Sequence, residues 1–312
     1  MNSESTNATG NVIQLTKVSR RFGSKLALNE VSLGVPRGKV FGLVGENGAG
    51  KTTLIKHLLG TLRAESGSVR LFGLDPVADP PAVLSRVGYL SENRDLPGWM
   101  RVDELLRYTE AFYPGWDAGY AEELRKQFAL ERSARIKQLS RGELAKAALL
   151  VAVAYRPELL LLDEPSSGLD PVVRRDILET IIRTVAEDGR TVFFSSHLLE
   201  EVERVSDEVA MLHAGKVLWC GPLDEVKAEH LRLVLRFEAS QTRPPVIPGA
   251  LSIQGGGQEW TLICNGARQE LNTTVARLGA RIVEEHTPSL SEIFVARAAQ
   301  KGLLTTLPNP QE

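Results

Sequence analysis

The sequence predicts an α/β protein with a mostly parallel, covered sheet and a smaller second domain, on three observations. A glycine-rich loop at residues 45–53 joins the apolar run Val40–Val44 to a segment with helical spacing. From about residue 140 to residue 220, short apolar runs alternate with helical segments, which favours a sheet covered by helices. Near His230 the pattern starts again on a smaller scale and indicates a separate α+β unit.

The first half of the chain supplies strands and one helical insertion. Strands are predicted at residues 12–18, 31–35, 40–44, 68–72 and 87–90, and a helix follows the glycine-rich loop. Apolar residues such as Leu105 and Phe112 then recur at helical spacing between about Arg101 and Ala134, with a break near Pro114–Gly115. We therefore expect a helical subdomain at about residues 95–155.

The second half completes the large domain and adds the small one. Helices are predicted at residues 140–155, 172–186 and 198–205, buried strands at 159–162 and 191–195, and a hairpin at 208–220. The α+β unit contains predicted strands at 231–238 and 280–285, a hairpin around Gly255–Gly257, and helices at 270–278 and 291–299. We expect a disordered tail at 1–11, the large domain at 12–228, the small domain at 229–300 and a tail at 301–312.

Composition narrows the classes of partner. The net charge of -2 and the pI near 6.3 argue against nucleic acid as the main ligand. Cys220 and Cys264 lie far apart without metal-ligand spacing, so we expect buried thiols in a reducing compartment. No signal peptide is apparent in residues 1–11, and the most apolar stretch, 147–162, is interrupted by charge and too short to span a bilayer. If the protein works at a membrane, another chain supplies the spanning helices.

The glycine-rich loop reads Gly-Glu-Asn-Gly-Ala-Gly-Lys-Thr-Thr and is a complete P-loop motif between strand and helix. Glycines let backbone N–H groups approach a phosphate, and the helix N-terminus adds a positive dipole. Lys51 would reach the β- and γ-phosphates, and the Thr52 hydroxyl would ligate Mg²⁺. The predicted nucleotide-binding residues here are Gly45, Glu46, Asn47, Gly48, Ala49, Gly50, Lys51, Thr52 and Thr53.

Two acids follow the buried strand at residues 159–162. Asp163 would hold the Mg²⁺ shell, and Glu164 would orient or deprotonate the attacking water. The alternative is an acidic turn that ends a core strand. Further upstream, Ser140 and Glu143 have the spacing of a capping box, and the same helix N-terminus could face a γ-phosphate. Spacing alone leaves both interpretations of Ser140 open.

Five motifs in order resemble those of an ATP-binding cassette (ABC) ATPase over about residues 12–225. They are the P-loop, Leu139–Glu143, Leu161–Pro165, Ser167–Asp170 and Ser195–His197. The resemblance implies a P-loop NTPase fold with an antiparallel N-terminal β-subdomain, and ATP with Mg²⁺ as ligands. It also implies that Phe22 stacks on adenine and that His197 touches the γ-phosphate. Ser140, Gly142 and Asp170 are implied to act across a dimer of two such chains.

The chain departs from the family pattern at two places. The signature motif usually has two glycines and a glutamine, whereas Arg141 and Glu143 stand here. Glu92 replaces the Q-loop glutamine, so a negative charge lies near the phosphates, although a carboxylate can still ligate Mg²⁺. ATP binding is therefore predicted more securely than turnover.

The single cassette with a short α+β tail resembles the ATPase subunits of ABC-2-type exporters, whose tails often carry the element found at Ser289–Phe294. That segment is alternatively an amphipathic helix packed on the small sheet. The resemblance implies a polytopic membrane permease as partner, a homodimer or a heterodimer with a related ATPase, and a peripheral location at the cytoplasmic face of the inner membrane. The permease would dock near Glu92 and residues 96–100.

Three other functions are considered. A soluble cassette protein of translation or DNA repair usually has two cassettes or a long coiled coil, which are not found here. A GTPase would need an Asn-Lys-x-Asp motif, which the sequence lacks. A regulatory nucleotide-binding protein with weak hydrolysis stays open because of Arg141 and Glu92.

Overall fold

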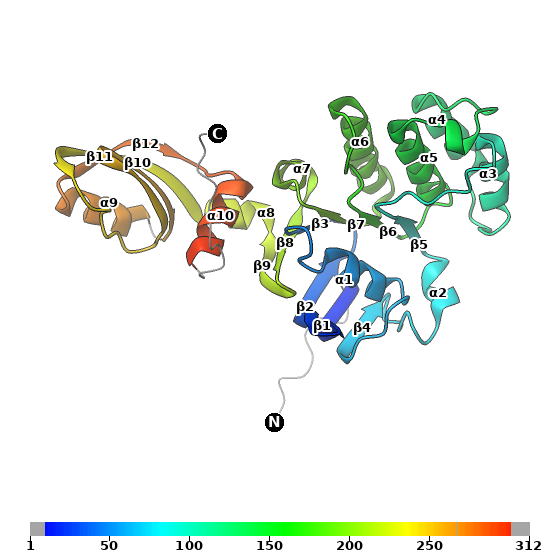
Figure 1. Ribbon diagram of the computed structural model, residues 1–312, viewed down its shortest axis with the longest axis horizontal. Coiled ribbons are helices and arrows are strands. Elements are labelled where there is room, and N and C mark those ends of the chain that lie inside the picture. The colour runs from blue at the N-terminus through cyan, green and yellow to red at the C-terminus, as the bar shows by residue number, and fades with distance from the viewer. Residues whose placement is uncertain (1–9, 267, 301–312) are drawn as a thin grey trace. The chain divides into compact units, whose positions relative to one another are not determined.

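The computed structural model describes residues 10–266 and 268–300 and divides the chain into two compact units, which meet in sequence between Cys220 and Gly221 (Figure 1). The predicted tails lie outside the described residues except for Gly10 and Asn11, and Asn11 already begins the first strand. The boundary between the units falls earlier than the expected one at residue 228, because the intervening helix α8 (Leu223–Ala228) is grouped with the second unit.

An antiparallel sheet opens the first unit. It contains β1 (Asn11–Phe22), β2 (Lys25–Pro36) and β4 (Ser66–Leu71) in the order β2-β1-β4. The predicted strands at 12–18 and 31–35 are the parts of one longer hairpin that lie far from its turn. The hairpin turns at Gly23, which has φ 56°. The part of β1 near the turn was not predicted, because Arg20 and Arg21 interrupt the apolar alternation.

The central sheet has six strands in the order β5-β6-β7-β3-β8-β9, and the pairs from β5 to β8 are parallel. Every residue of β3 and β6 is buried, as expected for strands covered on both faces. Phe41 of β3 and Phe193 of β7 stack with ring centroids 5.5 Å apart. The strands are β3 (Val40–Val44), β5 (Val87–Leu90), β6 (Leu159–Asp163), β7 (Thr191–Ser196), β8 (Glu208–His213) and β9 (Lys216–Pro222).

The helical insertion is present and breaks near Pro114–Gly115, as predicted. The short helix α2 was not predicted, because its single turn is too short to show a periodicity; Asp79 caps it and Pro80 begins it. The helices of this unit are α1 (Lys51–Leu58), α2 (Pro80–Leu84), α3 (Val102–Glu110), α4 (Ala118–Gln127), the 3₁₀ turn η1 (Ile136–Gln138), α5 (Arg141–Val153), α6 (Pro171–Asp188) and α7 (Leu199–Val205).

A charged cluster lies at the beginning of β6. Glu158 accepts hydrogen bonds from Arg86 at 2.5 and 2.9 Å and from Arg37 at 2.8 Å. The Arg86 guanidinium, followed by that of Arg37, lowers the pKa of Glu158 to about 2. The cluster therefore connects the segments that precede β3, β5 and β6 on the side of the sheet away from the P-loop.

The second unit is built on the antiparallel sheet β11-β10-β12, with β10 (His230–Gln241), β11 (Ala250–Asn265), β12 (Ala280–His286), α9 (Arg268–Arg277) and α10 (Leu290–Gln300). The two ends of β11 lie together, since the Asn265 amide donates to the Gly249 carbonyl at 2.8 Å; the segment thus folds back at its glycines, as the predicted hairpin requires.

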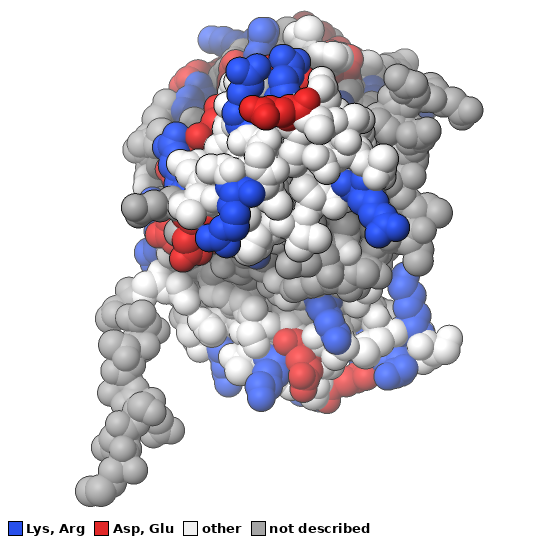
Figure 2. Space-filling view, turned by 90° about the vertical axis from the view of Figure 1, so that its left-hand side faces the viewer, with Lys and Arg blue, Asp and Glu red and all other residues white. Residues whose placement is uncertain are grey.

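Helix α10 contains the element that resembles exporter tails. Ser289 and Glu292 form a reciprocal cap at its start, and Leu290, Ile293 and Phe294 are buried. The packing role considered for this segment is therefore observed. Basic and acidic side chains both occur on the face drawn in Figure 2.

None of the helices within residues 10–266 and 268–300 has both the length and the apolarity needed to cross a bilayer.

Candidate active site

The P-loop connects β3 to α1 and leaves the first turn of that helix open to an anion. The residue at the N-cap is Gly50, which supplies no side-chain cap, so the first N–H groups of α1 are available to a phosphate. Gly50 has φ 112°, and a Cβ there would lie 2.5 Å from the Ala27 carbonyl oxygen. A Cβ at Gly45 would lie 2.3 Å from the Leu212 carbonyl oxygen. Only glycine fits these two positions, which confirms the strand–loop–helix context of the motif.

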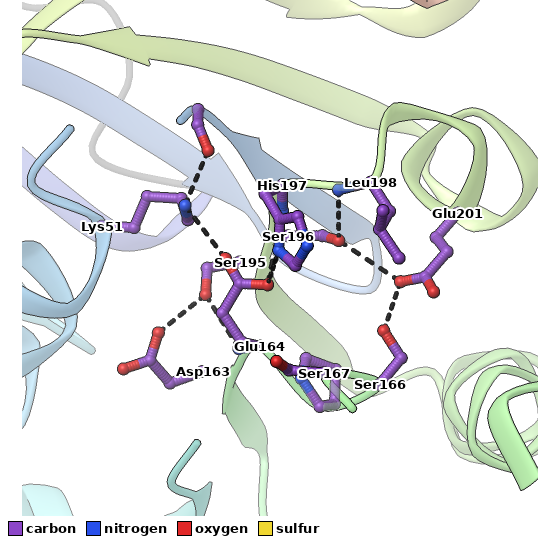
Figure 3. A network of polar contacts seen from close by, with 12 residues as sticks. Lys51, Asp163, Glu164, Ser166, Ser167, Ser195, Ser196, His197, Leu198 and Glu201 are labelled. Carbon is purple, nitrogen blue, oxygen red and sulfur yellow. Dashed lines mark hydrogen bonds and ion pairs between the residues drawn. The ribbon is translucent and has the colours of Figure 1, made fainter. Parts of the chain in front are cut away.

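Lys51 belongs to a buried polar network in which Glu164 is central (Figure 3). Its ammonium donates to the carbonyl oxygens of Gly45 at 2.6 Å and Glu46 at 3.2 Å, and forms an ion pair with Oε1 of Glu164 at 2.9 Å. The side chains of Lys51 and Glu164 are only 5% and 6% exposed, so bulk water solvates neither charge well. Lysine and acid therefore balance one another inside the site.

His197 contacts the other carboxylate oxygen of Glu164. Its Nδ1 lies 2.7 Å from Oε2, and its backbone N–H donates to the same oxygen at 3.3 Å. An ionised carboxylate only accepts hydrogen bonds, so in this pair Nδ1 carries the proton and Nε2 points elsewhere. The His197 side chain is 37% exposed, whereas Glu164 is buried. Glu164 thus lies between Lys51 and His197 (Figure 3).

Ser195 fixes the two acids at the end of β6 relative to β7. Its hydroxyl donates to Oδ1 of Asp163 at 2.8 Å and accepts the backbone N–H of Glu164 at 3.0 Å. Glu164 has φ 49°, in the left-handed region that costs a non-glycine residue about 1–2 kcal/mol. The hydrogen bond to Ser195 holds the backbone in this conformation.

One pocket, of about 330 Å³, gathers most of the predicted nucleotide-binding residues. Phe22 is 45% exposed at this pocket and carries the Arg20 guanidinium 5.0 Å from its ring centroid. The pocket is lined by Phe22, Lys25, Ala27, Asn47, Gly48, Gly50, Lys51, Thr52, Thr53, Glu92 and Glu164. Glu92 therefore lies beside the P-loop although 39 residues separate it from Thr53 in the sequence (92 − 53).

The predicted residues outside this pocket lining are those of the signature segment and the start of α6, and also Gly45, Glu46, Ala49, Asp163 and His197. Ser140 and Glu143 form the capping box of α5, with the Ser140 amide 2.8 Å from Glu143 Oε2 and the Glu143 amide 3.2 Å from Ser140 Oγ. Gly142 is buried against α6, where a Cβ would lie 2.8 Å from Val173. Asp170 caps α6 by accepting the amides of the residues at 172 and 173, and these amides lower its pKa. The structural interpretation of Ser140 is thus confirmed, and its hydroxyl remains near the protein surface.

The donor atoms beside the P-loop fit a divalent cation. Thr52 and Glu92 both line the pocket, and among the described contacts of Asp163 only Oδ1 accepts a hydrogen bond from a side chain. These are the hard oxygen donors that Mg²⁺ prefers. No group of three or more His, Cys, Asp or Glu side chains in the described ranges could hold a metal alone, so the remaining ligands would have to be phosphate and water oxygens.

Sequence reasoning missed several residues of the site. Lys25 lies beside the P-loop, since a Cβ on Gly48 would be 3.5 Å from its ammonium; its closeness in sequence to Phe22 was the available signal. Ser195 belonged to a recognised motif, but no role was assigned to its hydroxyl.

Arg94 was also missed. Its guanidinium donates to the carbonyl oxygens of Pro165 at 3.2 Å and Ser167 at 2.7 Å, and so connects the segment after Glu92 to the segment after Glu164.

Arg94 also lines a second pocket, of about 590 Å³. It is lined by Lys56, Leu59, Thr61, Leu62, Tyr89, Leu90, Ser91, Arg94, Asp95, Leu96, Ala148 and Val151. We call it the groove between α1 and α5, because both helices contribute to its walls. Arg94 thus belongs both to this groove and to the surroundings of the segment that follows Glu164.

Known proteins resemble this chain over most of its length. Residues 28–167 match the model of the ABC transporter family. The chain is 28% identical to the ABC transporter ATP-binding protein YtrB of Bacillus subtilis (strain 168), over 93% of this chain and 99% of that protein. It is 30% identical to the bacitracin transport ATP-binding protein BcrA of Bacillus licheniformis, over 76% of this chain and 78% of that protein.

Among solved structures, the ATP binding subunit of an ABC transporter has a TM-score of 0.64 and 28% identity, and the match covers 70% of this chain and 92% of that one. The P-loop, the paired acids and His197 lie together in the same large unit to which these matches mainly refer. The chain therefore belongs to the family of ABC transporter ATP-binding proteins, which bind and hydrolyse ATP as subunits of membrane transporters.

Proposed function

We propose that two copies of this chain, or one copy and a related ATPase, close over Mg²⁺–ATP and drive a separate membrane-spanning exporter subunit. The observation that carries the proposal is the single pocket in which Phe22, the P-loop, Glu92 and Glu164 come together. Each residue supplies a different part of the reaction: a stacking surface, phosphate binding, an oxygen ligand and a base.

Lys51 connects phosphate binding to activation of the base. In the structure its ammonium is shared between two P-loop carbonyls and Glu164. The three N–H donors of the Lys51 ammonium already face three acceptors, so a γ-phosphate in the pocket competes with Glu164 for one of them. The phosphate carries the larger negative charge and is therefore the stronger acceptor. Binding of ATP therefore weakens the Lys51–Glu164 ion pair and leaves Glu164 free to accept a proton from water.

Mg²⁺ would be held by the Thr52 hydroxyl directly and by Asp163 and Glu92 directly or through water. When bound, the ion neutralises charge on the β- and γ-phosphates. The charge of Glu92, which replaces an uncharged glutamine of the family, favours the metal-bound nucleotide over free ATP. Ser195 keeps Asp163 in place for this purpose.

Glu164 is the general base and His197 positions it and the γ-phosphate. A base must reach its water through a hydrogen bond of about 2.6–3.2 Å. The two contacts from His197 to Oε2 direct the carboxylate toward the pocket that it lines. The Nε2 atom of His197 is not the atom that contacts Glu164, and it can donate to a phosphate oxygen when the imidazole is doubly protonated.

The second copy would complete the site. Ser140 lies at a capped helix N-terminus near the surface and does not line the P-loop pocket of its own chain. Asp170 is likewise exposed at the start of α6. These positions support a dimer in which Ser140 and Gly142 of one chain meet the nucleotide held by the other, with the segment 167–170 between them.

The membrane subunit would dock in the groove between α1 and α5. The groove contains apolar side chains such as Leu59 and Leu96 together with charged ones, and Trp99, three residues after Leu96 in the sequence, is 70% exposed. Export is proposed because BcrA, a relative, is named for bacitracin transport. The chain would then be a peripheral protein at the cytoplasmic face of the cell membrane.

Glu164→Gln tests the proposal. We expect Mg²⁺–ATP to bind with affinity within about threefold of the wild type, turnover to fall at least about 100-fold, and a dimer to form with ATP. Nucleotide titration, phosphate release and light scattering measure the three quantities. Glu110→Gln, on exposed α3, is the control and should match the wild type. Unchanged turnover in Glu164→Gln would exclude Glu164 as the base.

A further inference from the structure

Glu201 joins the two segments that carry the catalytic pair. It lies on α7, is only 5% exposed, and its Oε2 accepts hydrogen bonds from the hydroxyls of Ser166 at 2.5 Å and Ser196 at 3.2 Å (Figure 3). Ser166 stands two residues after Glu164, and Ser196 immediately precedes His197. The carboxylate thus contacts both catalytic segments.

These contacts close a ring. On one side His197 contacts Glu164 directly, and on the other side Glu201 connects Ser166 to Ser196. Ser196 Oγ also accepts a hydrogen bond from the backbone N–H of Leu198. The residues on either side of His197 are therefore joined to one another. Glu201 therefore adds a connection between the ends of β6 and β7 to the direct Glu164–His197 contact and to the hydrogen bonds of Ser195.

Arg174 of α6 provides the opposite charge. Its Nε lies 3.0 Å from Oε1 of Glu201, and its Nη2 donates to the Leu169 carbonyl at 3.4 Å. The pair therefore holds both ends of the segment 166–169, through Ser166 and Leu169. A buried carboxylate requires such a partner and several hydrogen bonds, because desolvation disfavours an isolated charge.

We propose that Glu201 is a positioning residue for ATP hydrolysis: it sets the geometry of Glu164 and His197 and holds the segment 166–169 against α6. A neutral amide would fill the same space, but it would place an NH₂ donor against the Arg174 guanidinium in place of the second carboxylate oxygen. The proposal rests on the proposed role of Glu164 as the base. It adds a residue that does not line the nucleotide pocket.

Glu201→Gln is the principal test. The amide oxygen can still accept from the serines, but its NH₂ group then faces the Arg174 guanidinium, so the ring loosens with little change in volume. Misplacement by about 1 Å can reduce a rate by about 100-fold, and we expect kcat to fall at least about tenfold. The KM for ATP should change less than about twofold, since the contacts of Lys51 and the P-loop do not involve Glu201.

The controls separate positioning from folding. Glu200→Gln changes the neighbouring acid in the same first turn of α7, which is exposed, and should leave kcat unchanged. Rates are normalised to the number of sites that bind a fluorescent ATP analogue, so a smaller folded fraction does not count as slower chemistry. Ser166→Ala added to Glu201→Gln should cause less loss than the two separate effects predict, because both remove one connection.

Two outcomes overturn the inference: a kcat per binding site equal to the wild type in Glu201→Gln, or an equal loss in Glu200→Gln. Glu164→Gln is measured beside them. If that variant keeps its turnover, the proposed base is wrong. If it is inactive while Glu201→Gln is fully active, only the role of Glu201 is refuted.

Discussion

Ser195→Ala removes one hydroxyl and separates two roles of the acids beside it. The hydroxyl is buried, donates to Asp163 and accepts from the Glu164 amide. Alanine leaves a buried carboxylate oxygen and a buried N–H without these partners, and each orphaned group costs about 1–3 kcal/mol. We therefore expect the first unit to be destabilised by about 3 kcal/mol.

Thermal unfolding without nucleotide measures this effect. For a unit of this size, 1 kcal/mol corresponds to about 2–4 °C, so the transition should fall by about 6–12 °C. Turnover should fall as well, because the left-handed Glu164 loses the hydrogen bond that holds its backbone.

Ser206→Ala is the matched control. The Ser206 hydroxyl oxygen is also buried, but it has no hydrogen-bond partner among the described residues. Its removal should leave the transition unchanged or raise it slightly, by up to about 0.5 kcal/mol. Equal transition temperatures in Ser195→Ala and Ser206→Ala would refute the reasoning, because they would show that the two hydrogen bonds of Ser195 contribute nothing net.

Two further predictions concern the frame of the sheet. Glu158→Gln should cost about 1 kcal/mol at pH 7, since its side chain is 44% exposed and solvent screens the ion pairs. Because the pKa of folded Glu158 is lowered to about 2 from 4.5, the stability difference between the variant and the wild type is complete above about pH 4.5 and shrinks as the pH falls toward 2. Urea titrations between about pH 7 and pH 3 measure this stability difference. A difference that stays constant over this range would contradict the assignment. Gly88→Ala should cost about 3 kcal/mol in the same assay, because its Cβ would lie 2.3 Å from the Ala152 carbonyl oxygen. Gly221→Ala, with open space around its Cβ, should cost less than about 1 kcal/mol, and equal costs would contradict the steric argument.

The elements that could be predicted from sequence carry their signal within a few adjacent residues. The P-loop has its glycines, lysine and threonine in one run, and Asp163 and Glu164 directly follow a fully apolar strand. Capping of α5 by Ser140 and Glu143 depends on a spacing of three residues, and the structure shows both hydrogen bonds. In these cases local order determines the local structure, and the prediction follows.

The parts that escaped prediction depend on residues far apart in the chain. Ser195 reaches Asp163 across 32 positions and Glu201 reaches Ser166 across 35, so no window of sequence contains either pair. The extent of β1 also depends on its partner, since β2 pairs with Arg20 and Arg21 although their side chains break the apolar alternation. The contacts of Ser195 and Glu201 become visible only when the parallel strands β6 and β7 place their carboxyl ends side by side.

The Arg94 guanidinium ends on backbone carbonyls, and this choice of acceptor has a consequence for variation. Every residue type has the same carbonyl group, so substitutions at 165 and 167 that keep the local backbone leave both hydrogen bonds available. The groove wall and the segment that follows Glu164 can therefore stay connected while the side chains at 165 and 167 change. Both acceptors belong to the main chain, so side-chain substitutions at 165 and 167 do not remove them. A substitution of Arg94 removes both hydrogen bonds at once.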